Sequence, residues 1–267
     1  MSVPAPDPDM QLTFIGSAVV ASVVFNFIFG RGVGDVSCTY PAKFLPSSGA
    51  FGIWGPIYVF AILTIAEQMH SRSSNTGNYE TPISNVCYAL AWALAALWTS
   101  AFTLTTKRGG KEVPHPTGLL VAAVFLTLSA ASSMVAVFNS TAWNRSSKGS
   151  LRWISGVAFG MLSGWLTVAA TVNIAIAYNA NDNVPDTPCD PEDDKYTILD
   201  KADPQYETYV PLTLSFAMCL VAVALPNPIV LLPVIWALFW MRPSYLNYIS
   251  MALMLVVELI ALFRTFL

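Results

Sequence analysis

The residues best suited to binding chemistry gather in one short stretch, residues 44–58, which reads F-L-P-S-S-G-A-F-G-I-W-G-P-I-Y. Its glycines and prolines interrupt regular backbone, whereas Phe44, Phe51, Trp54 and Tyr58 provide large aromatic faces. Aromatic rings stack on flat apolar molecules, and the interruptions bend the chain into a structured loop. We therefore predict a structured lid that enters the membrane at a binding cavity.

Aromatic and polar residues further along the chain extend this candidate site. Trp98 lies in one apolar run, and Trp165 and Asn173 lie eight residues apart on one side of a later run. An asparagine in apolar surroundings needs a hydrogen-bond partner, so Asn173 either joins two helices or contacts a ligand. The tryptophans likewise either pack in the interior or offer flat surfaces to a ligand.

Two carboxylates, Glu67 and Glu258, lie within apolar runs, where a charged group is a candidate for function. Glu67 falls in the last turn of its predicted helix, from which it can reach the interface. Glu258 lies near the middle of the last run. Two roles stay open for Glu258, a hydrogen bond between helices or a direct part in ligand binding or transport.

Ordinary enzyme chemistry has little support in the sequence. Both histidines, His70 and His115, fall in predicted loops, so no imidazole is expected inside the bundle to ligate haem. The four cysteines show no C-x-x-C spacing, and Cys38 and Cys189 would pair only if their shared face of the membrane is oxidising. No nucleophile–base pair or phosphate loop is present. We predict no catalytic residue and no metal site.

The composition indicates a membrane protein. Of 267 residues, 55% are hydrophobic and only 11% are charged, against roughly 25% in soluble domains. The apolar runs are long enough to cross a hydrocarbon core of roughly 30 Å as helices, and too uniform for barrel strands. No basic stripe for nucleic acid is present. The predicted class is an all-α, multi-pass integral membrane protein.

The chain divides into four predicted parts. Residues 1–10 form a polar tail, and residues 11–180 contain five apolar segments. Residues 181–209 form an extramembrane loop with nine acidic residues and two lysines, and residues 210–267 contain additional membrane helices. The predicted spans are 11–30, 50–69, 83–105, 117–138, 153–178, 210–225, 229–241 and 245–266.

The number of C-terminal spans is open. As one straight helix, residues 210–241 would measure about 48 Å, and Pro226 and Pro228 interrupt them. This pattern predicts a tight hairpin and eight spans, and a re-entrant seventh segment would give seven. The distribution of Lys and Arg between the two faces does not decide the orientation.

Glycines at positions 156, 160 and 164 recur every four residues in the fifth segment. This spacing places all three on one face of a helix. Without side chains, that face lets a neighbouring backbone approach closely.

The loop and its neighbours resemble the translocator protein family, also known as the tryptophan-rich sensory protein family. The run from Gly34 to Pro46, followed by G-A-F-G-I-W-G-P-I-Y, is similar to the family's loop signature with the spacing of its longer branch. W-T-S-A-F, which begins at Trp98, is similar to a family element of the third helix. Ala95 stands where relatives usually have an asparagine, which leaves the polar part of the pocket in question.

The fifth segment resembles the family's last core helix, because Trp165, Ala169 and Asn173 fit its W-x-x-x-A-x-x-x-N element. The resemblance covers residues 11–180. It implies a five-helix bundle of the TspO type with a pocket beneath the loop between helices one and two, plus two or three C-terminal transmembrane helices. By motif position, the residues near the pocket would be Phe44, Pro46, Trp54, Trp98, Trp165 and Asn173.

The resemblance also implies a ligand class. Family ligands are tetrapyrroles such as protoporphyrin, sterols and hydrophobic drugs, so a tetrapyrrole (protoporphyrin or haem) or a sterol-like lipid is expected here. We expect a membrane receptor or carrier that contacts lipid and no nucleic acid, alone, as a homodimer or in a larger membrane complex. The predicted ligand-binding residues are Phe44, Pro46, Phe51, Trp54, Tyr58, Trp98, Trp165 and Asn173.

Two other functions remain as alternatives. The chain could be an accessory structural subunit of a larger membrane complex that holds lipid or pigment in its aromatic grooves. It could also be a transporter that depends on Glu258.

Overall fold

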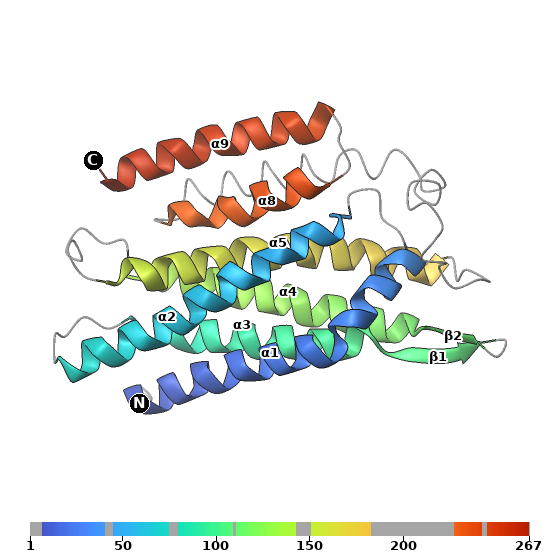
Figure 1. Ribbon diagram of the computed structural model, residues 1–267, viewed down its shortest axis with the longest axis horizontal. Coiled ribbons are helices and arrows are strands. Elements are labelled where there is room, and N and C mark those ends of the chain that lie inside the picture. The colour runs from blue at the N-terminus through green and yellow to red at the C-terminus, as the bar shows by residue number, and fades with distance from the viewer. Residues whose placement is uncertain are drawn as a thin grey trace, which may run out of the picture.

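The computed structural model describes the chain as a bundle of helices with one short β-hairpin (Figure 1). Five helices, α1 to α5, are long and apolar enough to cross a membrane, so the chain is a multi-pass membrane protein. The described residues are 7–40, 45–74, 80–108, 111–142, 151–182, 227–241 and 245–266. The elements are α1 (Pro8–Thr39), η1 (Ser48–Ile53), α2 (Trp54–Ser73), α3 (Pro82–Phe102), β1 (Thr105–Arg108), β2 (Lys111–Pro114), α4 (Pro116–Asn139), α5 (Trp153–Asp182), η3 (Pro228–Leu231), α8 (Leu232–Trp240) and α9 (Tyr245–Phe266).

The five long helices enclose one core. Helix α3 packs between α1 and α4, α5 packs between α4 and α2, and α2 returns to α1. Helix α8 packs on α5 and on η1, and α9 covers the outer side of α8, so the C-terminal part forms a further layer (Figure 1). The largest side chains that are less than 2% exposed in this core include Trp92, Tyr88, Phe102 and Phe159.

Three of the long helices begin in the same way, with a capping side chain followed by proline. Asp7, Thr81 and His115 each accept a hydrogen bond from a backbone N–H in the first turn of α1, α3 and α4, respectively. Proline then occupies the first helical position, where its missing N–H leaves no hydrogen bond unmade. His115 lies between β2 and α4, as predicted for a loop residue, and also caps α4, whereas His70 is an exposed residue in the last turns of α2.

The predicted first span, 11–30, agrees with the apolar stretch of α1 from Asp9 to Gly30, but the helix does not end there. Helix α1 continues to Thr39, past three glycines that each cost roughly 1 kcal/mol of helix propensity. Val33, Val36 and Tyr40 continue a buried stripe along the bundle, and Gly32 lets a methyl group of Thr103 approach from α3. Packing along this stripe therefore extends the helix beyond the predicted span.

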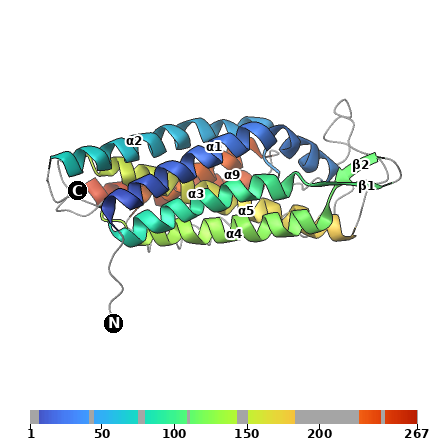
Figure 2. The ribbon, with the colours of Figure 1, turned by 90° about the horizontal axis from the view of Figure 1, so that it is seen from below.

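The connection between the third and fourth helices was expected to be a loop, and the structure shows an antiparallel hairpin there. Strand β1 pairs with β2 in a register that places Lys107 opposite Glu112. The N–H of His115 donates to the carbonyl of Leu104 at 2.8 Å, which joins the hairpin to the helix ends. Figure 2 shows the hairpin projecting beyond the bundle. Gly109 and Gly110 separate the strands in sequence, a spacing typical of tight hairpins.

The C-terminal region fits the predicted spans only in part. The predicted span 210–225, the acidic residues 183–209 and Cys189 lie outside the described residues. With η3, helix α8 has 13 residues and a length of roughly 22 Å, which is short of a membrane crossing. The apolar stretch of α9, Tyr248–Ile260, is also shorter than those of the five long helices. Additional C-terminal spans therefore stay a prediction.

Candidate ligand-binding site

The loop from α1 into α2 contains the lid, defined here as residues 45–53. Its 3-10 turn, η1, leads directly into α2 at Trp54. Pro46, Ala50 and Ile53 are buried, whereas Phe51 is 39% exposed. Phe44 lies outside the described residues, so its predicted role stays a prediction.

Behind the lid, seven rings from four elements form one aromatic cluster. Trp54 stacks on Tyr58 at 5.5 Å between ring centroids, and Tyr58 stacks on Trp92 at 5.3 Å. The edge of Trp165 contacts Phe51 at 5.9 Å and Trp54 at 6.2 Å. Such offset and edge-on arrangements are those that aromatic pairs prefer. The aromatic cluster consists of Phe51, Trp54, Tyr58, Tyr88, Trp92, Phe159 and Trp165.

Some polar atoms of the aromatic cluster have a hydrogen-bond partner among the described residues, and others do not. The hydroxyl of Tyr58 accepts a hydrogen bond from the side-chain amide of Asn26 at 2.8 Å. The hydroxyl of Tyr88 and the indole nitrogen of Trp92 lie close to each other without forming a hydrogen bond of normal geometry. The indole nitrogen of Trp165 has no partner among the described residues. A buried N–H without a partner is costly, so this part of the cluster is able to donate a hydrogen bond to a bound molecule.

Trp98 and Asn173 form a separate contact between α3 and α5. The indole N–H of Trp98 donates to the side-chain oxygen of Asn173 at 2.8 Å, and the Asn173 amide donates to the carbonyl of Ala169 at 3.1 Å. Trp98 stacks against Phe102 rather than against the aromatic cluster. Of the two roles predicted for Asn173, the structure shows the hydrogen bond between helices. Its contact with a ligand stays a prediction.

Asn26 was not among the predicted site residues, although it links three helices. Besides its bond to Tyr58, its side-chain oxygen accepts from the hydroxyl of Thr99 at 3.4 Å. The same hydroxyl donates to the carbonyl of Ala95, so Asn26 supplies an amide near the position where family relatives usually have an asparagine. The signal in the sequence is a single asparagine between Phe25 and Phe27 in an apolar run, where an amide needs a partner.

Glu67 lies inside the bundle and does not reach the interface as the sequence allowed. Only 5% of its surface is exposed. Its carboxylate accepts from the hydroxyl of Ser71 at 3.2 Å and from the hydroxyl of Ser155, on α5, at 2.8 Å. Next to it, Gln68 donates to Asn85 at 3.0 Å. These bonds hold α2 against α5 and α3 at the end of the bundle opposite the hairpin.

A second buried carboxylate, Glu80, lies just before α3 and was not predicted. It accepts from the backbone N–H of Thr141 at 3.0 Å, and Thr141 in turn accepts from the guanidinium of Arg152. Burial raises the pKa of Glu80, against the opposing effects of the Thr141 hydrogen bond and the positive charge of Arg152. Glu80 and Arg152 therefore fasten the loop after α4 to the start of α3 and α5.

Glu258 is 2% exposed, on the inner face of α9. Neither of its carboxylate oxygens has a hydrogen-bond partner among the described residues. The hydroxyl of Ser250, two turns earlier, is also buried without a partner there. The structure therefore does not show the hydrogen bond between helices that was one of the two roles open for Glu258.

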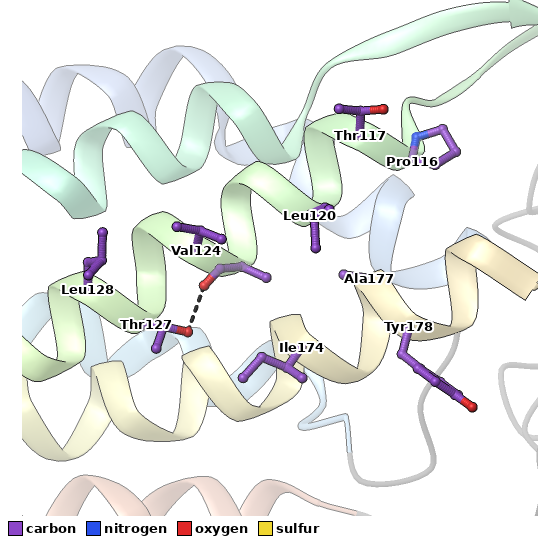
Figure 3. A pocket seen from close by; sticks show the side chains of 10 residues that line it. Pro116, Thr117, Leu120, Val124, Thr127, Leu128, Ile174, Ala177 and Tyr178 are labelled. Carbon is purple, nitrogen blue, oxygen red and sulfur yellow. Dashed lines mark hydrogen bonds between the residues drawn. The ribbon is translucent and has the colours of Figure 1, made fainter.

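A groove of about 570 Å³ lies on the outer surface between α4 and α5, away from the lid. Figure 3 shows Leu120, Val124 and Leu128 of α4 on one side and Ile174 of α5 on the other. No lining residue belongs to the aromatic cluster. The groove faces outward with exposed apolar side chains, as expected of a surface in contact with lipid.

The predicted site residues therefore separate into groups. Phe51, Trp54, Tyr58 and Trp165 meet in the aromatic cluster, whereas Trp98 and Asn173 pair elsewhere. Pro46 is buried in the lid. Tyr88, Trp92 and Phe159 complete the aromatic cluster, and the four-residue spacing of the first two on α3 is the sequence signal that could have added them. Among the described residues, no three His, Cys, Asp or Glu gather to hold a metal ion.

Comparison with known families gives one match. The sequence model of the family described as "TSPO-like protein" matches residues 10–185, which includes the lid and all five long helices except the first two residues of α1. No curated protein and no solved structure matches the chain significantly.

Proposed function

The chain belongs to the TSPO-like protein family, and on that premise we propose that it is a membrane receptor or carrier for a planar hydrophobic ligand. The ligand is a tetrapyrrole or a sterol-like molecule, held beneath the lid against the aromatic cluster. Binding energy comes from stacking and from apolar contact. The indole N–H of Trp165, which has no partner among the described residues, supplies one oriented hydrogen bond.

The observation that carries this proposal is the mutual packing of Trp54, Tyr58 and Trp92 directly behind the lid, with ring centroids 5.3 to 6.1 Å apart. Aromatic faces gathered this closely supply stacking partners for a planar macrocycle. The rings touch one another, so a ligand is accommodated only when they separate and the lid moves. Trp54, the first residue of α2, is the ring that follows such a movement most directly.

Protoporphyrin titration of the purified protein, followed by tryptophan emission, tests the proposal. We expect saturable quenching by wild type, and a dissociation constant about three- to tenfold higher for Trp54→Phe, because an aromatic pair contributes roughly 0.5–1.5 kcal/mol. Trp153→Phe is the matched control, since Trp153 is exposed at the start of α5, outside the aromatic cluster. A flat titration of folded wild type, or equal weakening in both variants, refutes the proposed site.

The burial of Glu258 favours a second candidate function, that of a transporter coupled to protons. Glu258 is buried and has no hydrogen-bond partner among the described residues, and a carboxylate in that state is costly when charged. Binding and release of a proton there would be linked to a change in its surroundings. Protoporphyrin uptake into liposomes is then expected to depend on pH in wild type and to lose that dependence in Glu258→Gln. Glu67→Gln is the control, because Glu67 already accepts two hydrogen bonds. Uptake with the same pH dependence in wild type and Glu258→Gln contradicts this function.

A further inference from the structure

Residues 227–241 lie beyond the family match and pack along α5 toward the lid. This segment comprises Asn227, η3, α8 and Met241. The side-chain amide of Asn227 donates to the carbonyl of Gly156 at 2.8 Å. One turn further along α5, Gly160 contacts Asn227 and Ile229, with no room for a Cβ of its own. Gly164 likewise lies against the carbonyl of Val230 and the ring of Pro233. The glycine face of α5 therefore fixes the first half of this segment.

The second half of the segment ends on the lid. The indole N–H of Trp236 donates to the carbonyl of Ala50 at 2.9 Å. The backbone N–H of Ser47 donates to the carbonyl of Trp240 at 2.9 Å. Between these two bonds, Gly49 lies against the ring of Trp240, where a Cβ would overlap the ring. Three consecutive contacts thus hold the lid backbone from the side of α8.

The same lid residues set the position of the aromatic cluster. Ala50 has no exposed surface, and the next residue is Phe51, whose ring contacts Trp165. Trp54 follows at the start of α2 and stacks on Tyr58. A displacement of the lid away from α8 therefore moves Phe51 and loosens the rings over the proposed binding site.

We infer that Trp236 and Trp240 are positioning residues that hold the lid closed over the aromatic cluster. The inference rests on the proposed function for its ligand, although the contact itself is a property of the unliganded protein. The lid opens when its bonds to α8 break, while η3 stays attached to α5 through Gly160 and Gly164. The binding site of this chain is thus completed by a segment outside the region that it shares with its family.

Hydrogen exchange of the unliganded protein tests the contact directly. Trp236→Phe removes the N–H donor to Ala50 and keeps an aromatic ring, and Gly49→Ala displaces the ring of Trp240 from the other side. In both variants we expect the amides of Ser47 and Ala50 to exchange about fivefold faster or more, since one hydrogen bond contributes roughly that factor. Trp153→Phe is the control and is expected to leave lid exchange unchanged.

Binding kinetics distinguish a positioning role from a merely structural one. Association and dissociation rates of protoporphyrin are expected to rise by similar factors in Trp236→Phe, with the dissociation constant and the unfolding temperature changed little. Unchanged lid exchange in both variants overturns the inference, whether or not porphyrin binds. Faster lid exchange in a protein to which porphyrin does not bind supports the contact with α8 and refutes the proposed ligand instead.

Discussion

The hydrogen bond between Trp98 and Asn173 joins α3 to α5, so we expect this pair to stabilise the helix bundle. A double-mutant cycle measures how much the bond contributes to stability. Trp98→Phe removes the N–H donor, and Asn173→Leu removes the acceptor at similar volume. The double variant removes both. Each side chain is only 4% exposed, so water does not replace the missing partner in the single variants.

The structure sets the size of the effect. Asn173→Leu leaves the buried indole N–H without an acceptor, which costs about 1–3 kcal/mol. Trp98→Phe leaves the amide oxygen unpaired and also removes part of a ring. Hydrogen bonds between transmembrane helices contribute about 0.6 kcal/mol on average and reach about 1.7 kcal/mol. We therefore expect a coupling energy of about 1 kcal/mol, so that the double variant is more stable than the two single effects predict.

The assay is the free energy of unfolding of the four proteins in mixed detergent micelles without ligand. A second cycle combines Asn173→Leu with Trp153→Phe, whose ring is exposed at the start of α5, and is expected to be additive. A coupling energy below about 0.3 kcal/mol, within the error of such cycles, refutes the assignment of this bond to the bundle.

Two further predictions concern a helix contact and a buried charge. Gly164→Ala places a Cβ against the Val230 carbonyl and is expected to lower the free energy of unfolding by about 1–3 kcal/mol. Gly16→Ala is the control, because its Cβ meets open space, and it is expected to raise the free energy of unfolding by up to about 1 kcal/mol. Equal effects of the two substitutions in chemical unfolding contradict the close contact at Gly164. Burial raises the pKa of Glu80, so the folded state binds the proton more tightly than the unfolded chain, and stability falls as pH rises above the ordinary glutamate value of about 4.3. Glu80→Gln is expected to lose this decline, and a stability difference between wild type and variant that stays constant as pH rises from about 4.3 contradicts the prediction.

The five-helix unit was predictable because its signals are local. Long apolar runs gave α2 to α5 within a few residues, and the glycines spaced by four correctly predicted a close backbone neighbour of α5. Helix α1 continues past its predicted span because Val33, Val36 and Tyr40 form a buried stripe along the bundle. Packing against α3 is a tertiary effect that helix propensity does not contain.

The candidate site was predictable only in part, because contacts between distant segments decide it. The lid sequence identified Trp54 and Tyr58, but their ring partner Trp92 comes from another helix. Composition alone does not distinguish Trp98, which pairs with Asn173, from the tryptophans of the aromatic cluster. The attachment of the lid to Trp236 joins residues 186 positions apart, and no local pattern encodes it.

The segment on the glycine face of α5 also determines how copies of this chain can associate. Faces of small residues commonly serve as helix dimer interfaces, but in this chain residues 227–233 pack against Gly160 and Gly164 and cover that face. A tethered segment acts at an effective concentration on the order of millimolar, so this face stays covered regardless of how densely the protein populates its membrane. A homodimer of this chain would therefore have to use another surface.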